Sequence, residues 1–262
     1  MKLGFIGIGN MAQAIINGIS GSHHITISTR SDKRSQELAQ SLNTFYAKDN
    51  QTCAQNADIL FLCIKPEQFS TVIDEIRPVL KNQTIVSIAA KLTIEDIQSL
   101  LQKDLGIIRI MPNLNVTIKE GMSAIATSEG VDPVALTIVE SIFQDLGQCV
   151  RIDEAHFSTF IGIAGSAPAF VFKFMNALLE EAKKDGLDPS LSLDIIAQTL
   201  SGSAHYLQKS QVQPHILVDR VCSKGGTTIE GVQSLDEDQF EPILQRAVRK
   251  TINKDKTSKL IT

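Results

Sequence analysis

The fold of this chain is decided by its first stretch, Lys2-Leu3-Gly4-Phe5-Ile6-Gly7-Ile8-Gly9-Asn10-Met11-Ala12. The residues before Gly7 form a largely apolar run that is typical of a buried strand. Gly7 to Ala12 fit the pattern Gly-x-Gly-x-x-Ala, and apolar residues at helical spacing follow at Ala14, Ile15, Ile16 and Ile19. A motif between a strand and a helix indicates a dinucleotide-binding loop rather than an ordinary turn with small residues.

Each small residue of this motif has a physical task. Gly7 permits the tight turn, Gly9 lets the backbone approach a pyrophosphate, and Ala12 allows the helix to pack closely on the strand. The N–H groups at the helix start, around Asn10 and Met11, have no partner inside the helix and favour an anion. These five residues are predicted to bind the cofactor.

The composition is that of an ordinary globular protein. Of the 262 residues, 43% are hydrophobic and 21% are charged, so the chain can bury a core and exceeds the usual size of one domain. Its 25 basic and 29 acidic residues give a net charge of −4, which provides no electrostatic attraction to nucleic acid or to an anionic membrane. We therefore expect a small-molecule substrate and neither of those partners.

Cysteine and histidine usage predicts no metal site and a reducing compartment. The five histidines show no zinc-binding spacing, and the four cysteines are scattered without a Cys-x-x-Cys pair, at Cys53, Cys63, Cys149 and Cys222. No signal-peptide pattern precedes the first strand, and each long apolar run is interrupted before membrane-spanning length. We expect a cytoplasmic protein.

The chain is expected to divide into two domains. Short apolar runs alternate with helical patterns through residues 1–153, which predicts βαβ units and a parallel sheet. The predicted strands are Lys2–Ile6, Ile25–Thr29, Ile59–Ile64, Thr84–Ile88, Ile107–Met111, Ser123–Thr127 and Gln148–Ile152. Residues 154–262 lack this strand signal and show apolar residues at helical spacing. The predicted fold class is α/β, a Rossmann-like doubly wound sheet domain followed by an all-helical C-terminal domain.

Local signals place several helix ends. Thr93 followed by Asp96 indicates a capped helix start, and Asp132-Pro133 begins another helix. In the second domain, Pro168 is expected to break or kink the first helix. Gly186 and Asp188-Pro189 mark the end of one helix and the start of the next.

The end of the second predicted strand carries basic rather than acidic residues. NAD-binding units usually place Asp or Glu there to accept a hydrogen bond from the ribose 2′-hydroxyl, whereas this chain has Thr29-Arg30-Ser31 followed by Lys33. Arg30 and the nearby hydroxyls would form charge-assisted hydrogen bonds with a 2′-phosphate. We therefore expect NADP(H) as the preferred cofactor and NAD(H) as the alternative. An exposed arginine in a polar turn is the structural alternative for Arg30.

Three further segments are unusual for a generic core: Cys63-Ile64-Lys65-Pro66, Arg109-Ile110-Met111-Pro112-Asn113 and Val221-Cys222-Ser223-Lys224-Gly225-Gly226-Thr227-Thr228-Ile229. With the opening stretch and Ser87-Ile88-Ala89-Ala90, they resemble the pyrroline-5-carboxylate reductase family over nearly the whole chain. The resemblance implies an oxidoreductase that reduces 1-pyrroline-5-carboxylate to L-proline with NADPH, the last step of proline biosynthesis. It also implies a homodimer or a higher homo-oligomer.

The Gly-Gly-Thr-Thr segment is the predicted substrate site. A Gly-Gly pair that opens a helix offers backbone N–H donors to a small carboxylate, and the threonines add hydroxyls. In the family that this chain resembles, the loop holds the pyrroline carboxylate, and the second threonine hydrogen-bonds the ring nitrogen. The predicted catalytic residue is thus Thr228, and the predicted substrate-binding residues are Ser223, Gly225, Gly226, Thr227 and Thr228. A turn with an N-cap is the structural alternative.

The resemblance extends the cofactor site beyond the glycine motif. It implies that Asn50, Ile64 and Lys65 lie along the adenosine and ribose, and that Ala89 and Ala90 approach the nicotinamide. A solvated lysine before a proline is the structural alternative for Lys65. Hydride transfer to a protonated imine needs little acid catalysis, so the protein would mainly supply proximity, desolvation and orientation.

The sequence departs from the family pattern at several positions. Leu114 and Asn115 stand where the family's Met-Pro-Asn run continues with Thr and Pro. Further departures are Lys91 for Gly, Ala167 for Gly, Phe170 for Tyr and Lys224 for Pro. These changes bear on efficiency and on the identity of the substrate.

Two other functions fit parts of the same pattern. A β-hydroxyacid dehydrogenase-like oxidoreductase would use Lys173 as acid/base with Asn176 on the same helical face, although the Gly-x-Met-Gly form of that family is missing here. A non-catalytic NADP-binding paralogue would account for the departures. NADPH oxidation that depends on the imine, NADP reduction that depends on a hydroxyacid, and cofactor binding without turnover distinguish the three.

Overall fold

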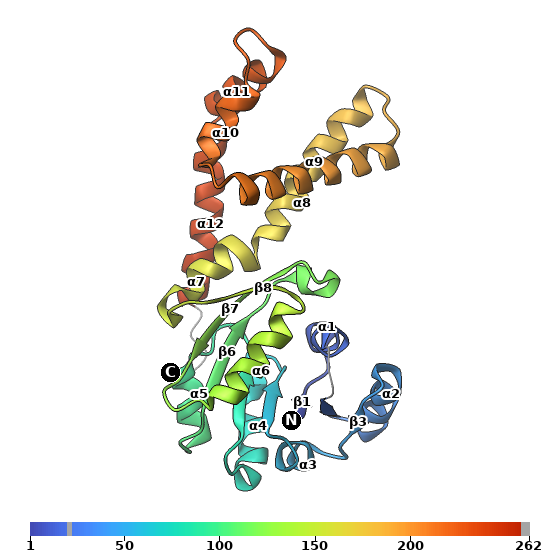
Figure 1. Cartoon of the computed structure of the whole chain (residues 1–262), viewed down its shortest axis with the longest axis vertical. Coiled ribbons are helices and arrows are strands. Elements are labelled where there is room, and N and C mark those ends of the chain that lie inside the picture. The colour runs from blue at the N-terminus through green and yellow to red at the C-terminus, as the bar shows by residue number, and fades with distance from the viewer. Residues whose placement is uncertain (20–22, 258–262) are drawn as a thin grey trace. The chain divides into compact units, whose positions relative to one another are not determined.

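The computed structural model describes residues 1–19 and 23–257 (Figure 1). By its internal contacts the chain forms two compact units, one of Met1–Ser166 with the segment from Thr251 onward and the other of Ala167–Lys250. The sequence placed its boundary after residue 153, where the strands end. The first unit continues past that point because Phe157 and Phe160 pack against Ala124 and Ala126 of the sheet.

The first unit is built on one eight-stranded sheet with the order β3-β2-β1-β4-β5-β6-β7-β8. The strands are β1 Lys2–Ile6, β2 His24–Ser28, β3 Phe45–Tyr46, β4 Ile59–Leu62, β5 Thr84–Ser87, β6 Ile107–Met111, β7 Gly121–Thr127 and β8 Gly147–Arg151. Neighbouring strands are parallel except β6 and β7, which pair antiparallel with Ile110 opposite Ile125. The sheet is therefore mostly parallel, as predicted, with one antiparallel pair that the sequence did not indicate.

Helices cover both faces of this sheet, as a doubly wound fold requires. On one face Leu3, Phe5 and Ile27 pack against buried residues of α1 (Asn10–Gly18), α2 (Asp32–Leu42) and α6 (Pro133–Gln144). On the other face Leu60 and Ile85 pack against α3 (Asn50–Gln55), α4 (Phe69–Ile76) and α5 (Ile94–Leu101). Because both faces are buried, β4 and β5 consist entirely of buried residues.

All seven predicted strands are present, with their ends within two residues of those expected. The strand that the sequence did not predict is β3, whose Phe45 and Tyr46 are exposed by 60% and 48%. The predicted helix starts are also confirmed. Thr93 and Asp96 form the capping box of α5, and Asp132 caps α6 by accepting a hydrogen bond from the Val134 N–H.

One buried ion pair joins three elements of the first unit. The Arg109 side chain in β6 is 5% exposed, and its Nη1 donates to Glu154 Oε1 at 2.8 Å. The same carboxylate oxygen accepts the Ile94 N–H of α5 at 2.9 Å, and the guanidinium stacks 4.5 Å from the ring centroid of Phe157. This contact fixes the start of α5 and the chain beyond β8 to the sheet.

Short helical turns connect these elements: η1 Pro66–Gln68, η2 Arg77–Val79, η3 Leu114–Ile118, η4 Glu154–His156, α7 Phe157–Phe160 and the π-helical η5 Ile161–Gly165. The second unit is helical, with α8 Ala167–Lys184, α9 Pro189–Ser210, α10 Pro214–Val221, α11 Thr227–Glu237 and most of α12 Phe240–Thr257. Pro168 lies at the second position of α8. The helical run from Phe157 is interrupted just before it by the π-helical η5 and by Ser166, which agrees with the expected break, because the proline nitrogen carries no hydrogen-bond donor.

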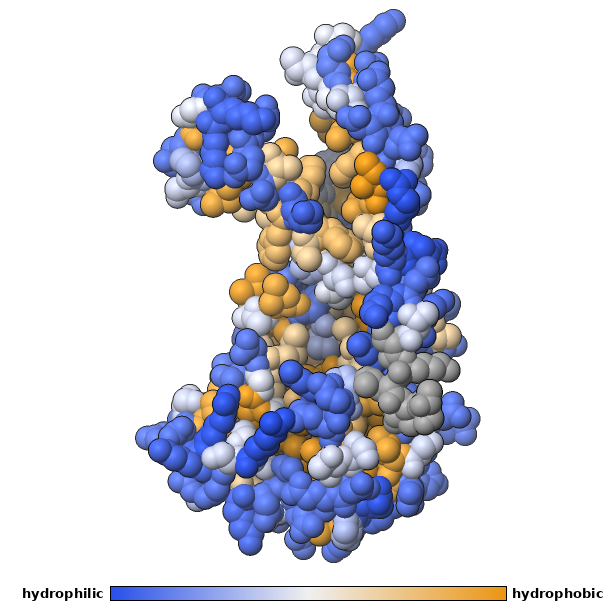
Figure 2. Space-filling view, turned by 180° about the vertical axis from the view of Figure 1, so that it is seen from behind, coloured by the Kyte–Doolittle hydropathy of each residue, from blue (hydrophilic) through white to orange (hydrophobic). Residues whose placement is uncertain are grey.

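The helices of the second unit present apolar side chains to the surface, as the orange areas of Figure 2 illustrate. No residue of α8 is fully buried, and Phe172 and Ile195 are 52% and 48% exposed. Within the described residues, the helical stretch Glu154–Lys184 is long and apolar enough to cross a membrane by length and composition. The apolar run is thus longer than the sequence analysis expected, and exposed apolar surface of this kind is typical of an interaction site.

Candidate active site

A groove of about 480 Å³ lies where β1, β2 and β4 end. Its lining residues are Ile6, Gly7, Ile8, Gly9, Thr29, Arg30, Arg34, Asn50, Cys63, Ile64, Lys65, Gln68 and Val72. Strand β1 has β2 on one side and β4 on the other, so the groove occupies the point where the strand order reverses. Open α/β sheets bind their ligands at this point, outside the carboxyl ends of the strands.

Gly7 is required by the geometry of the groove's floor. Its φ is +86°, and a Cβ at this position would come within 2.7 Å of the Cys63 carbonyl oxygen. Its N–H donates to the Ser28 carbonyl oxygen at 2.9 Å, which holds the loop against the end of β2. The tight turn expected of Gly7 is present.

Gly9 differs from Gly7 because it contributes open space and does not need an unusual backbone conformation. It is the N-cap of α1 with φ −84°, and no atom lies within 4 Å of a Cβ built there. Asn10 and Met11 begin α1, which has no side-chain cap and no acidic residue in its first turn. A pyrophosphate fits this arrangement, since the open side of Gly9 faces the unpaired N–H groups of a helix start. Ala12 is 1% exposed and packs in the core.

Two arginines, rather than one, line the groove beyond β2. Arg30 and Arg34 are both exposed, and neither forms an ion pair with another described residue. The hydroxyls nearby hold the turn instead: Thr29 Oγ1 donates to the Ser31 carbonyl at 3.0 Å, and Ser31 caps α2. Lys33 lies outside the groove, with its Nζ 3.9 Å from Glu37 Oε1.

Arg34 was not predicted, although its spacing carries a signal. It lies four residues after Arg30, and once Ser31 is taken as an N-cap, Arg34 falls in the first turn of the helix. The sequence alone did not determine where that helix begins. The prediction therefore named Lys33, and not Arg34, as the second cation near the 2′-phosphate.

The other predicted cofactor residues fall into two groups. Asn50, Ile64 and Lys65 line the groove, and the Lys65 N–H donates to Gln68 Oε1 at 3.2 Å. Ala89 and Ala90 follow β5, the neighbour of β4, and do not line this groove. Their approach to a nicotinamide therefore stays a prediction.

The thiols of the first unit are held in their protonated form by burial. Cys53 is fully buried, and desolvation raises its pKa to about 12. Desolvation also raises the pKa of Cys149 to about 11 and raises that of Cys63, which lines the groove. The cysteines are all unpaired in the structure.

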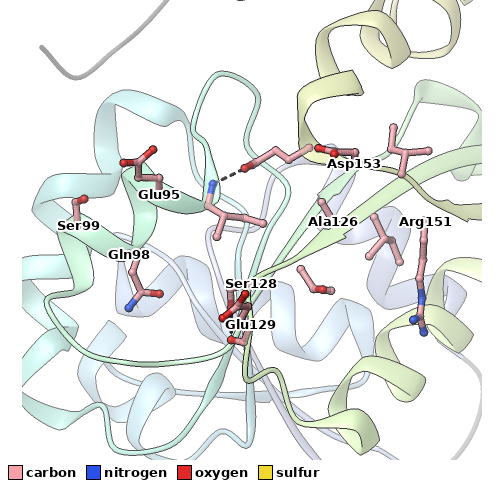
Figure 3. A pocket seen from close by; sticks show the side chains of 13 residues that line it. Glu95, Gln98, Ser99, Ala126, Ser128, Glu129, Arg151 and Asp153 are labelled. Carbon is pink, nitrogen blue, oxygen red and sulfur yellow. Dashed lines mark hydrogen bonds between the residues drawn. The ribbon is translucent and has the colours of Figure 1, made fainter.

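A larger pocket of about 820 Å³ lies between α5, β7 and the chain after β8 (Figure 3). It includes none of the predicted site residues, and its lining carries the carboxylates of Glu95, Glu129, Asp153 and Glu154. Its basic residue, Arg151, forms two hydrogen bonds with Glu140, which does not line the pocket. An acidic surface of this kind does not suit a phosphate-rich cofactor.

The predicted substrate loop lies in the second unit and opens α11. Gly225 has φ +72°, and the Gly226 N–H donates to the Ser223 carbonyl at 2.9 Å. The positive φ of Gly225 favours glycine, whereas a Cβ on Gly226 would meet only the Ser223 hydroxyl, which can rotate away. Gly226 is the N-cap without a side-chain cap, and Thr227 and Thr228 are exposed in the first turn. The loop thus presents N–H groups and hydroxyls together.

Some of the departures from the family pattern have visible consequences. Lys91, which replaces a glycine, has φ +72°, a conformation that costs an L-residue about 1–2 kcal/mol. Asn113 is buried, and its Oδ1 accepts the N–H groups of Asn115 and Met122 at 3.2 Å each. The residues after it therefore serve a structural turn, with Leu114 53% exposed.

The remaining departures and the rival residues all lie in the second unit. Ala167 and Phe170 fall in the first turn of α8, and Lys224 is exposed beside the glycine pair. Lys173 and Asn176 are both exposed on α8.

Comparison by sequence matches a different family model at each end of the chain. Residues 154–258 match the family model of pyrroline-5-carboxylate reductase dimerisation, and residues 2–91 match the model described as coenzyme F420-dependent NADP oxidoreductase. The pyrroline-5-carboxylate reductase of Escherichia coli is 35% identical over 98% of both chains. Pyrroline-5-carboxylate reductase 2 of Bacillus subtilis is 34% identical over 95% of this chain and 92% of its own.

Solved structures agree over the full length. The 1-pyrroline-5-carboxylate reductase of Streptococcus pyogenes is 36% identical, with a TM-score of 0.91 and 98% of both chains covered. The pyrroline carboxylate reductase of Plasmodium falciparum, solved with NADP bound, is 27% identical, with a TM-score of 0.89 over 99% of this chain and 98% of its own.

The fold, with a groove at its topological switch point, is that of the Rossmann class of dinucleotide-binding oxidoreductases, which agrees with the NADP oxidoreductase model that residues 2–91 match. Two relatives that are 34% and 35% identical over 95% and 98% of this chain show which family within that class it belongs to. The chain belongs to the pyrroline-5-carboxylate reductase family.

Substituting each glycine of the loop with alanine should separate folding from binding. Gly7→Ala forces a side chain into backbone at a positive φ, so we expect a loss of about 2–4 kcal/mol in the free energy of unfolding. Gly9→Ala meets open space and should keep the stability within about 0.5 kcal/mol. Its Cβ should nevertheless weaken dinucleotide binding about tenfold or more, because it fills the approach to the pyrophosphate. Denaturant melts measure the stability and fluorescence titrations measure the binding. Equal stability losses for Gly7→Ala and Gly9→Ala would contradict the different roles given to the two glycines.

Proposed function

We propose that this chain reduces 1-pyrroline-5-carboxylate to L-proline with NADPH, which occupies the groove at the ends of β1, β2 and β4. The observation that carries the proposal is full-length similarity to named pyrroline-5-carboxylate reductases, together with a groove whose glycine loop fits a pyrophosphate. A spectrophotometric assay of NADPH oxidation with pyrroline-5-carboxylate tests it directly. Absence of imine-dependent turnover by a folded protein that binds NADPH would leave the non-catalytic alternative.

The residues divide the work between recognition and orientation. When bound, the reduced dinucleotide supplies the hydride that the imine carbon accepts. The helix start at Gly226 would offer N–H donors to the substrate carboxylate, and the Thr228 hydroxyl in the first turn of α11 would hydrogen-bond the ring nitrogen. A protonated imine is already electrophilic, so orientation and exclusion of water are the main requirements on the protein.

The charges of the groove favour NADPH over NADH. Its described lining contains Arg30, Arg34 and Lys65 and no Asp or Glu. A carboxylate that would accept from a ribose 2′-hydroxyl is therefore missing, whereas two guanidinium groups are available for a 2′-phosphate.

Changing either arginine should alter the preference between the two cofactors. We expect Arg30→Asp to raise the Kd for NADPH by about 10- to 100-fold and the Kd for NADH far less, because a phosphate partner becomes a like charge. Arg34→Ala should act in the same direction with a smaller loss. Lys33→Asp is the matched control, since it makes the same charge change outside the groove. Equal losses for both cofactors would place the 2′-phosphate elsewhere.

Thr228→Val tests the substrate loop, because valine keeps the shape and removes the hydroxyl. We expect kcat/KM for pyrroline-5-carboxylate to fall about 5- to 150-fold, the equivalent of one hydrogen bond, with NADPH binding unchanged. Thr227→Val should lower kcat/KM less if the alignment with the family motif is right.

Lys173→Ala should retain most activity, and its inactivation in a folded protein would favour the hydroxyacid dehydrogenase mechanism.

We further propose that two copies of the chain associate through the second unit. The matched family model describes dimerisation, and α8 carries an apolar face without a buried residue. Light scattering should give a mass of at least two chains. Phe172→Asp, at a residue 52% exposed, should shift the protein toward monomer, whereas Glu181→Gln in the exposed pair with Lys184 should not. A wild-type monomer would contradict the proposal.

A cytoplasmic location is proposed on chemical grounds. All four cysteines are unpaired, which suits a reducing compartment. Fractionation of cells that produce the full-length protein tests this.

A further inference from the structure

The side chain of Asn50 is held from two sides before any ligand reaches it. Asn50 is the first residue of α3 and lines the groove. Its Oδ1 accepts from the Ser28 hydroxyl at 2.8 Å, and its Nδ2 donates to Glu75 Oε2 at 2.8 Å. An amide can make about four hydrogen bonds, so one N–H and one acceptor site remain for the groove.

Glu75 decides which way this amide faces. An ionised carboxylate only accepts hydrogen bonds, so the group turned toward Glu75 has to be the NH₂ of Asn50. The oxygen is then left for Ser28, whose hydroxyl can donate. Without the carboxylate, rotation of the amide by a half turn would exchange donor and acceptor on the groove side as well.

Each partner in this chain of hydrogen bonds is itself fixed to the fold. Ser28 is fully buried at the end of β2, and its carbonyl receives the Gly7 N–H. Glu75 lies in α4 between the buried residues Ile73 and Ile76, and its carbonyl accepts from Gln51 Nε2 at 2.9 Å. The amide of Asn50 is thus held at a fixed position relative to the glycine loop.

We propose that Glu75 is a positioning residue for the cofactor's adenosine half and acts through Asn50. Glu75 does not line the groove, so its effect on binding passes through the amide that it orients. The inference rests on the proposed use of a dinucleotide in this groove. Adenosine and its ribose are common to NADPH and NADH, and the effect of Glu75 is therefore the same for both cofactors, unlike that of Arg30.

The experiment measures the Kd of NADPH and of NADH by titration of the full chain, together with kcat at saturating cofactor. We expect Glu75→Ala to raise both Kd values about 5- to 10-fold, as for one lost hydrogen bond, with their ratio and kcat near wild type. Glu75→Gln keeps an acceptor for Asn50 Nδ2 and should restore both Kd values to within about twofold. Asp74→Ala is the matched control, because Asp74 precedes Glu75 on α4 and pairs with Arg77.

A double-mutant cycle separates positioning from a general effect on the fold. Asn50→Ala alone should weaken both cofactors. In that background, Glu75→Ala should cost no further affinity, since the group that it orients is gone. A full loss on top of Asn50→Ala would overturn the proposal and assign Glu75 a structural role.

Two other results would also overturn it. Wild-type affinity in Glu75→Ala would show that the Glu75 carboxylate does not determine the orientation of the Asn50 amide. A change confined to NADPH, most simply tighter binding in Glu75→Gln, would show that the charge of Glu75 acts on the 2′-phosphate at a distance. A wild-type chain that binds neither dinucleotide would instead refute the proposed function.

Discussion

The close approach of three strand ends at Gly7 is the constraint on which the site depends. Its N–H reaches the end of β2, and the space where a Cβ would stand is occupied by the Cys63 carbonyl and Ile64 after β4. The groove is the gap that remains above this contact. Arg30 and Lys65 line it because each follows its strand by only a few residues.

One helix in each unit starts with a geometry that suits an anion. Both α1 and α11 begin at a glycine N-cap that makes no side-chain hydrogen bond, whereas Ser31, Thr93 and Asp188 cap their helices with a side chain. A side-chain cap satisfies the N–H groups that a ligand would use. A glycine N-cap leaves these N–H groups available to a ligand, which we propose is a pyrophosphate in one unit and a small carboxylate in the other.

The strands could be predicted because burial on both faces makes them continuous apolar runs, and their order follows from the rules of α/β folds. Local pattern could not supply β3, which is two exposed residues long, or the direction of β7 relative to β6, which depends on how the chain crosses the sheet. Asn50 and Lys65 were assigned to the cofactor site from the family resemblance and not from the chemistry of their side chains. Arg34 depended on the helix register, and Glu75 on a contact 25 residues away in sequence, so neither could be seen without the tertiary structure.

The buried thiols have a consequence for how the protein meets oxidants and alkylating reagents. Such reagents attack the thiolate, and a raised pKa leaves almost none of it at neutral pH. Cys53 and Cys149, with pKa values of about 12 and 11, therefore behave as small apolar side chains, and so does Cys63 despite lining the groove. Cys63 in the groove should therefore react slowly with thiol-directed reagents at neutral pH.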